Sequence, residues 1–182
     1  QIQQCSLVHA INYDDARLRA TTQFRKLYKN SLLQKAEVYV SDLQRAECSK
    51  VEFMFSYNYG EDFVNKSATY TIEPSSIASK FYDNIDTICV YPAIGFSSPI
   101  NDYYPIDVSD LWLILKEHIG AMDFLDIEEM VTLKNIAVSS IDVPTWCLNV
   151  STPQEGKTKY GKVYINAING EYRVDWVIKK KK

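Results

Sequence analysis

The sequence predicts an α+β fold made of two tandem units packed together, each with one helix and an antiparallel meander of strands. Three observations lead to this prediction. Two segments carry apolar residues at helical spacing, and several others alternate apolar and polar residues as half-buried strands do. The order of these segments then repeats in the second half of the chain. At 182 residues, 46% of them hydrophobic, the chain can bury a core without disulfide staples.

The first helix is expected over residues 13–33. Asn12 precedes it as a capping residue, and Asp14 and Asp15 occupy its first turn, where carboxylates interact favourably with the helix dipole. Apolar side chains form one stripe along it: Ala16, Ala20, Phe24, Leu27 and Tyr28. The other faces are basic, which is typical of a solvated surface and would also suit contact with an acidic partner.

Strands are expected after this helix. The alternating segments of the first half cover residues 37–43, 51–57, 67–73 and 86–91, with a short helix over residues 75–82. The second and third of these strands form a natural hairpin, because a turn-like segment at residues 58–62 separates them.

The second half begins with a helix over residues 108–120. Asp107 is its candidate cap, Asp110 three residues later gives a variant of the capping box, and Gly120 is a plausible stop. The apolar stripe comprises Val108, Leu111, Trp112, Leu115 and Ile119, widened by Leu113 and Ile114. Strands follow over residues 130–141, 145–150, 160–167 and 172–178, with Asn169-Gly170 as a hairpin turn.

An offset of 93 residues lays the first half over the second. It places Asp14 on Asp107 and Phe53 on Trp146, and no gap is needed from the helix to the third strand. The offset predicts that residues 14–73 superpose on residues 107–166, and that Phe53 and Trp146 both lie between sheet and helix. It also predicts a division into three parts: a first unit over residues 1–91, a connection over residues 92–107 and a second unit over residues 108–182.

Charge and cysteine content exclude several classes of protein. The net charge of −3 provides no global attraction to nucleic acid, so no nucleic-acid partner is expected. No apolar run reaches the roughly 20 residues that a transmembrane helix needs. The cysteines, expected to be free or partly paired, are Cys5, Cys48, Cys89 and Cys147. Without a C-x-x-C pair, and with only two histidines, they predict no metal site.

The sequence predicts no catalytic site and no cofactor. Cys5 and Cys147 have no base close to them in the sequence, His118 lies among apolar helix residues, and neither phosphate-binding glycine motif is present. The paired carboxylates, such as Glu61/Asp62, are adjacent residues, which diverge on a helix or a strand and make poor acid/base pairs. We therefore expect a protein that is not an enzyme.

The strongest binding candidate is the aromatic connection between the halves. Its candidate binding residues are Tyr91, Phe96, Asn101, Asp102, Tyr103 and Tyr104. Tyrosines often anchor interfaces, and three prolines in residues 92–107 restrict the backbone. The alternative is that the rings fill the junction between the halves. In the first case, replacing Tyr103 and Tyr104 with alanine abolishes binding and spares the fold, whereas in the second the same change unfolds the protein.

The second half resembles a PepSY-like domain of secreted bacterial proteins. The similarity rests on the helix at residues 109–115, on residues 143–149 with Trp146 opening a strand, and on the closing hairpin at residues 161–171. In that hairpin, Asn166 and Asn169 replace the usual Asp and Thr. The resemblance implies a cystatin-like layout and a binding or inhibitory module, with no catalytic residues.

The resemblance also implies an exported bacterial protein, secreted or periplasmic, that recognises a protein or peptide. The start at Gln1, without an initiator Met, suits either a shortened version of the chain or a processed, mature form. Two alternatives remain open at this point. One is an immunity protein that neutralises a toxin in the cytoplasm, and the other is a small enzyme whose site is assembled from dispersed residues.

Overall fold

The structure is a computed structural model, and it describes residues 12–27, 29, 31–58, 64–72, 84–92, 100, 104–119 and 126–180. Within these residues there are two helices and nine strands. The elements are α1 (Tyr13–Leu27), β1 (Leu32–Asp42), β2 (Glu47–Asn58), β3 (Val64–Ile72), β4 (Asn84–Pro92), α2 (Val108–Ile119), β5 (Asp126–Ile127), β6 (Met130–Val138), β7 (Ile141–Gln154), β8 (Lys157–Asn166) and β9 (Tyr172–Lys180). The short helix expected over residues 75–82 lies outside the described residues.

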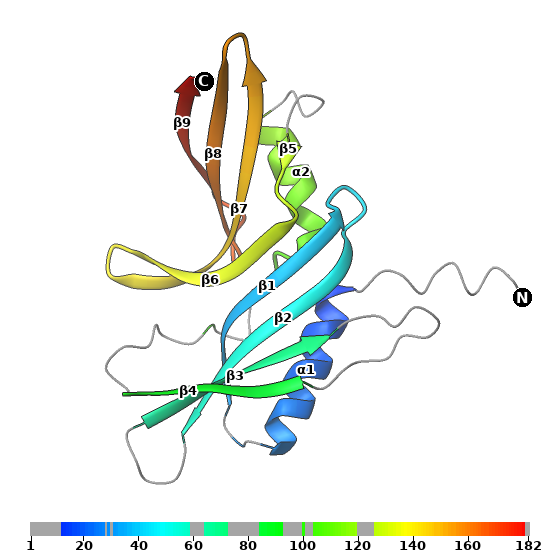
Figure 1. The fold of residues 1–182 in the computed structure, drawn as a ribbon, viewed down its shortest axis with the longest axis vertical. Coiled ribbons are helices and arrows are strands. Elements are labelled where there is room, and N and C mark those ends of the chain that lie inside the picture. Colours follow the sequence, from blue (N-terminus) through cyan, green and yellow to red (C-terminus); the bar gives the residue numbers. More distant parts are fainter. Residues whose placement is uncertain are drawn as a thin grey trace, which may run out of the picture.

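All strands belong to one antiparallel sheet, so the α+β class is confirmed (Figure 1). Their order is β4-β3-β2-β1-β6-β7-β8-β9, and the short β5 pairs with β7. The two halves meet where β1 pairs with β6, with Val38 directly opposite Val131. The halves therefore share one continuous sheet and are not two separate sheets packed against each other. The proposed division at residues 91 and 108 stays a prediction.

The first helix is shorter than its sequence predicts. It ends at Leu27, and β1 begins at Leu32. From Leu33 onward the buried positions belong to a strand, because Ala36, Val38 and Val40 alternate with more exposed residues. Pairing of β1 on both edges, with β2 and with β6, outweighs the local helical pattern.

The strand predicted over residues 130–141 ends earlier than expected, at Val138. A two-residue turn at Ser139 and Ser140 separates β6 from β7, and Val138 pairs with Ile141 across it. Both serines have positive φ angles, 50° and 66°. A tight hairpin turn of this hand usually takes Asn and Gly, so its position was not evident from the sequence.

Each helix buries part of the stripe that its sequence predicts. Ala16, Ala20 and Phe24 of α1 are fully buried, and the Phe24 ring stacks on Phe55 with centroids 4.6 Å apart. On α2 the buried residues are Val108, Leu111 and Leu115. Leu113, which was expected to widen that stripe, is instead 65% exposed, so the α2 stripe is narrower than predicted.

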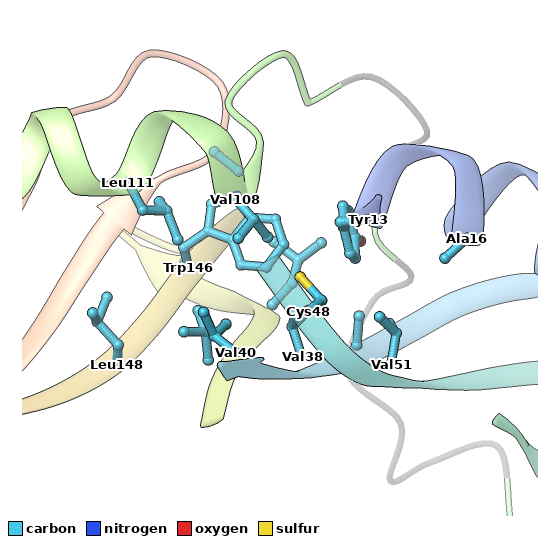
Figure 2. Close-up of a cluster of buried hydrophobic side chains, with 14 of the residues drawn as sticks. Tyr13, Ala16, Val38, Val40, Cys48, Val51, Val108, Leu111, Trp146 and Leu148 are labelled. Carbon is cyan, nitrogen blue, oxygen red and sulfur yellow. The ribbon is translucent and has the colours of Figure 1, made fainter. Parts of the chain in front are cut away.

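Phe53 and Trp146 occupy the centre of the core on either side of the junction. Both are fully buried, as predicted. The Tyr13 ring contacts each of them, with its centroid 5.9 Å from Phe53 and 5.1 Å from Trp146. Figure 2 shows Trp146 beside Val108 and Leu111 of α2. One ring at the start of α1 therefore links the cores of the two halves.

No helix among the described residues is long and apolar enough to cross a membrane. The thiols of Cys48 and Cys147 are free. Burial raises the pKa of Cys48 to about 12 and that of Cys147 to about 11, so both thiols are neutral at physiological pH and react slowly.

We expect the Gly161→Ala substitution to lower the free energy of unfolding by about 1–3 kcal/mol, because the added methyl group overpacks the site. A Cβ atom there would lie 2.8 Å from Cζ3 of Trp176 and 3.0 Å from Cγ2 of Val150. Urea denaturation measures the loss. In a Trp176→Ala background the same substitution should cost much less, and an equal cost in both backgrounds would contradict the proposed clash.

Candidate functional site

A hollow of about 430 Å³ lies where the N-terminal ends of α1 and α2 approach each other. It is larger than two other hollows of the described residues, which measure about 200 and 190 Å³. Its lining residues come from α1, from α2 and from the segment that precedes α2: Tyr13, Asp14, Arg17, Tyr104, Pro105, Asp107, Ser109 and Asp110.

Helix capping fixes the acidic groups of this hollow. At α1, the backbone N–H of Asp15 donates to the Asn12 side chain at 3.1 Å, as the sequence predicts. At α2, the N–H of Val108 donates to Asp107 Oδ1 at 2.7 Å, and the N–H of Asp107 donates to Asp110 Oδ2 at 2.8 Å. Asp110 therefore makes its half of the predicted capping-box variant, whereas the Asp107 carboxylate accepts from Val108 and the N–H of Asp110 donates to the backbone oxygen of Asp107.

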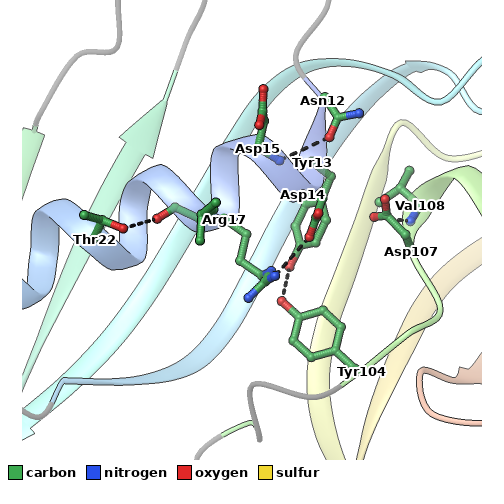
Figure 3. A network of polar contacts seen from close by, with 10 residues as sticks. Asn12, Tyr13, Asp14, Asp15, Arg17, Thr22, Tyr104, Asp107 and Val108 are labelled. Carbon is green, nitrogen blue, oxygen red and sulfur yellow. Dashed lines mark hydrogen bonds and ion pairs between the residues drawn. The ribbon is translucent and has the colours of Figure 1, made fainter.

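Two tyrosines form the inner wall of the hollow. The hydroxyls of Tyr13 and Tyr104 are 3.0 Å apart and share a hydrogen bond, as Figure 3 shows. Burial is the main cause that raises the pKa of Tyr104 to about 12, and it raises the pKa of Tyr13 as well. Both phenols are therefore neutral at physiological pH, and each can donate or accept a hydrogen bond.

Among the described residues that line the hollow, Arg17 is the one that carries a positive charge. Its Nη2 donates to Asp14 Oδ1 at 3.0 Å, and its guanidinium carbon lies 5.3 Å from the centre of the Tyr104 ring (Figure 3). The Nε atom of Arg17 is buried and has no hydrogen-bond partner among the described residues. The hollow thus has a buried donor without an acceptor.

The carboxyl group of Asp107 is in an unfavourable environment for its charge. Burial is the largest cause that raises its pKa, and the nearby carboxylates of Asp14 and Asp110 raise it further. The hydrogen bond from the backbone N–H of Val108 acts in the opposite direction. A cation placed beside Asp107 would stabilise its charged form and lower this pKa again.

Chemically, the hollow combines hydrogen-bond acceptors, one guanidinium donor and two phenols. These groups suit recognition of a ligand that presents both donors and acceptors. Among the described residues, no group of three or more His, Cys, Asp or Glu side chains could hold a metal ion.

Of the binding residues expected from the sequence, the structure places Tyr104 in this hollow. The backbone of Tyr91 lies in β4, opposite Asn65. The remaining candidates lie outside the described residues: Phe96, Asn101, Asp102 and Tyr103. Tyr104 itself packs against the core and lines the hollow, so it contributes both to the junction and to the candidate site.

Sequence reasoning did not identify Tyr13, Arg17 and Asp107 as site residues. It did place Asp14 and Asp107 at equivalent helix starts, which was the one available signal that these positions are related. Comparisons of the chain with family models, with curated proteins and with solved structures found no match.

Proposed function

We propose that this chain is a non-enzymatic, exported bacterial binding or inhibitory module that recognises a protein or peptide. It is built from two PepSY-like units, each with one helix and an antiparallel meander. The observation that carries the proposal is the hollow between the two helix starts, in which carboxylates, a guanidinium and two phenols converge.

The cross-strand register supports two related units. A single row of directly opposed residues crosses the sheet through the junction: Tyr70, Phe53, Ala36, Leu133, Trp146 and Ile165. On one side of the pair Ala36 and Leu133 the next residue in the row is Phe53 of β2, and on the other side it is Trp146 of β7. Each half therefore has an aromatic residue at this position. In this register Leu133 is the counterpart of Ala36, four residues beyond the constant offset, and Ile165 is the counterpart of Tyr70, two residues beyond it. The relation between the halves therefore includes shifts in β6 and in β8.

The ligand that suits the hollow is a peptide segment with a basic residue. Three carboxylates line it against one guanidinium, so the site has a negative surplus that a lysine or arginine side chain would balance. Burial raises the pKa of the Asp107 carboxyl group, and the basic side chain of the ligand would serve as its counter-ion.

Selection from random-sequence peptides displayed on phage tests this function. We expect the wild-type protein to enrich peptides containing Lys or Arg and to release them intact. The double variant Asp107→Asn with Asp110→Asn should reduce their capture by roughly tenfold, because two opposing charges are lost while both caps keep an oxygen acceptor.

The matched control is Asp15→Asn, which changes an exposed carboxylate in the first turn of α1 that does not line the hollow. It should leave capture unchanged, and thermal melting should show that all variants are folded. Peptides captured equally by the wild type and by the double variant would refute the site. Cleaved peptides would refute the non-enzymatic assignment.

A further inference from the structure

The face of β6–β9 that points away from α2 has a chemistry different from that of the hollow. Side chains on these strands alternate between two faces. One set, which includes Trp146, Val163 and Ile165, is fully buried with α2. The other set includes Lys134, Cys147, Lys162, Tyr164 and Arg173. We call this second set, with its neighbours on the same strands, the outer face.

Positive charge dominates the strand positions of the outer face. It carries Lys134, Lys162, Arg173 and Lys179, and the one carboxylate at an alternating position is Asp175. Asp175 is 3.9 Å from Arg173. Neither Lys134 nor Lys162 is within ion-pair distance of a carboxylate among the described residues. The chain as a whole has a net charge of −3, so this basic surface is a local feature.

Two adjacent hollows shape the outer face. The first, about 200 Å³, is lined by the directly opposed residues Thr132 and Cys147 and by Lys134 and Lys162. The second, about 190 Å³, is lined by aliphatic residues that include Ile136 and Val143. Tyr164 lines both hollows, so a basic depression lies directly beside an apolar one.

The apolar side of this surface continues to the end of the β6–β7 hairpin. Val138 is 53% exposed and Ile141 is 67% exposed at the two-residue turn. Glu171 stands at the edge of the apolar hollow, and Glu128 accepts a hydrogen bond from Asn149 at the edge of the basic one.

We propose that the outer face binds an acidic polypeptide segment in which a carboxylate lies next to an aliphatic side chain. The carboxylate contacts Lys134 and Lys162, and the aliphatic side chain fills the hollow beside Ile136 and Val143. This surface is separate from the hollow between the helices and is independent of the function proposed for it. Complementary charge positions the segment, and burial of the aliphatic group adds affinity.

The same observations disfavour a nucleic acid as the occupant. Single-stranded nucleic acids bind to basic grooves in which bases stack on exposed aromatic rings. Here Arg173 lies over the Tyr164 ring at 4.4 Å, and Lys179 lies 5.4 Å from the Tyr160 ring centre. The rings are already covered by cations, and a phosphate backbone would leave the aliphatic hollow empty.

Fluorescence anisotropy with synthetic peptides at physiological salt tests the proposal. The probe is a labelled eight-residue peptide that alternates Glu and Leu. Two comparison peptides replace Glu with Lys or Leu with Ser. We expect the Glu/Leu peptide to bind and both comparison peptides to bind at least about tenfold more weakly, because each lacks one half of the match.

The decisive variant is Lys134→Glu with Lys162→Glu, which should weaken binding of the Glu/Leu peptide by about tenfold or more. The matched control is Lys29→Glu with Lys116→Glu, which makes the same change in net charge at two exposed lysines elsewhere. The control should bind the peptide nearly as well as the wild type does. Thermal melting of both variants verifies that they are folded.

Three outcomes would overturn the proposal. In the first, both double variants bind the peptide equally, which means that only net charge matters. In the second, the Glu/Ser peptide binds as tightly as the Glu/Leu peptide, so the apolar hollow is not used. In the third, a labelled single-stranded oligonucleotide or vesicles with anionic lipid bind more tightly than the peptide and depend on Lys134 and Lys162. Asp107→Asn with Asp110→Asn leaves this binding unchanged, so this test and that of the inter-helix hollow can fail separately.

Discussion

The Trp146→Ala variant is expected to lose about 3–5 kcal/mol of its free energy of unfolding, as buried aromatic residues do when they are truncated. Trp146 is fully buried and is the largest side chain in that class. Its Nε1 donates to the carbonyl oxygen of Ile106 at 2.8 Å, and its ring meets Tyr13 edge-on. The substitution therefore opens a cavity at the junction and leaves a carbonyl group without its partner.

Urea denaturation monitored by far-ultraviolet circular dichroism measures this loss without relying on tryptophan fluorescence. The matched control is Trp112→Ala on α2, where the same substitution removes a ring that is only partly buried. It should cost clearly less. Equal losses for the two variants would show that Trp146 does not occupy the centre of the core.

The local patterns predicted the elements well because most helices and strands here are amphipathic. The alternation predicted from residue 51 is present over residues 51–55, and the α2 cap at Asp107 is present as well. The errors arise where long-range pairing determines the result. The end of α1 was misplaced because the pairing of β1 with β2 and β6 was unknown, and the Ser139-Ser140 turn lacks the usual turn residues.

The candidate site was harder to predict than the fold. Tyr104 was selected because it lies in an aromatic connecting segment, but its hydrogen-bond partner Tyr13 is 91 residues away in the sequence. Asp107 was identified as a cap, yet its proximity to Asp14 depends on how β1 and β6 join the two halves. The outer face was missed because lysines on alternating strand positions are typical of any solvated sheet.

The Val131→Asp variant is expected to destabilise the whole chain, with a cost of about 3–5 kcal/mol for a buried charge without a partner. Val131 and Val38 are fully buried and directly opposite each other where the halves join. Since a domain of this kind is stable by only about 5–15 kcal/mol, the variant should be close to unfolding at physiological pH. The folded state raises the pKa of the new carboxyl group, so the loss should shrink as the pH falls towards the ordinary range of Asp.

The matched control is Thr132→Asp, which puts the same side chain one residue further along β6, on the outer face, where Thr132 is opposite Glu37. Its cost should be about 1 kcal/mol or less, because the carboxylate stays in contact with water.

The continuous sheet also predicts that the two halves unfold together. If β1 and β6 join the halves into one cooperative structure, Val131→Asp shifts a single urea transition that ellipticity and tyrosine fluorescence report alike. Two separate transitions, with one half unaffected by the substitution, would show that the units fold independently and that the pairing of Val38 with Val131 contributes little to either.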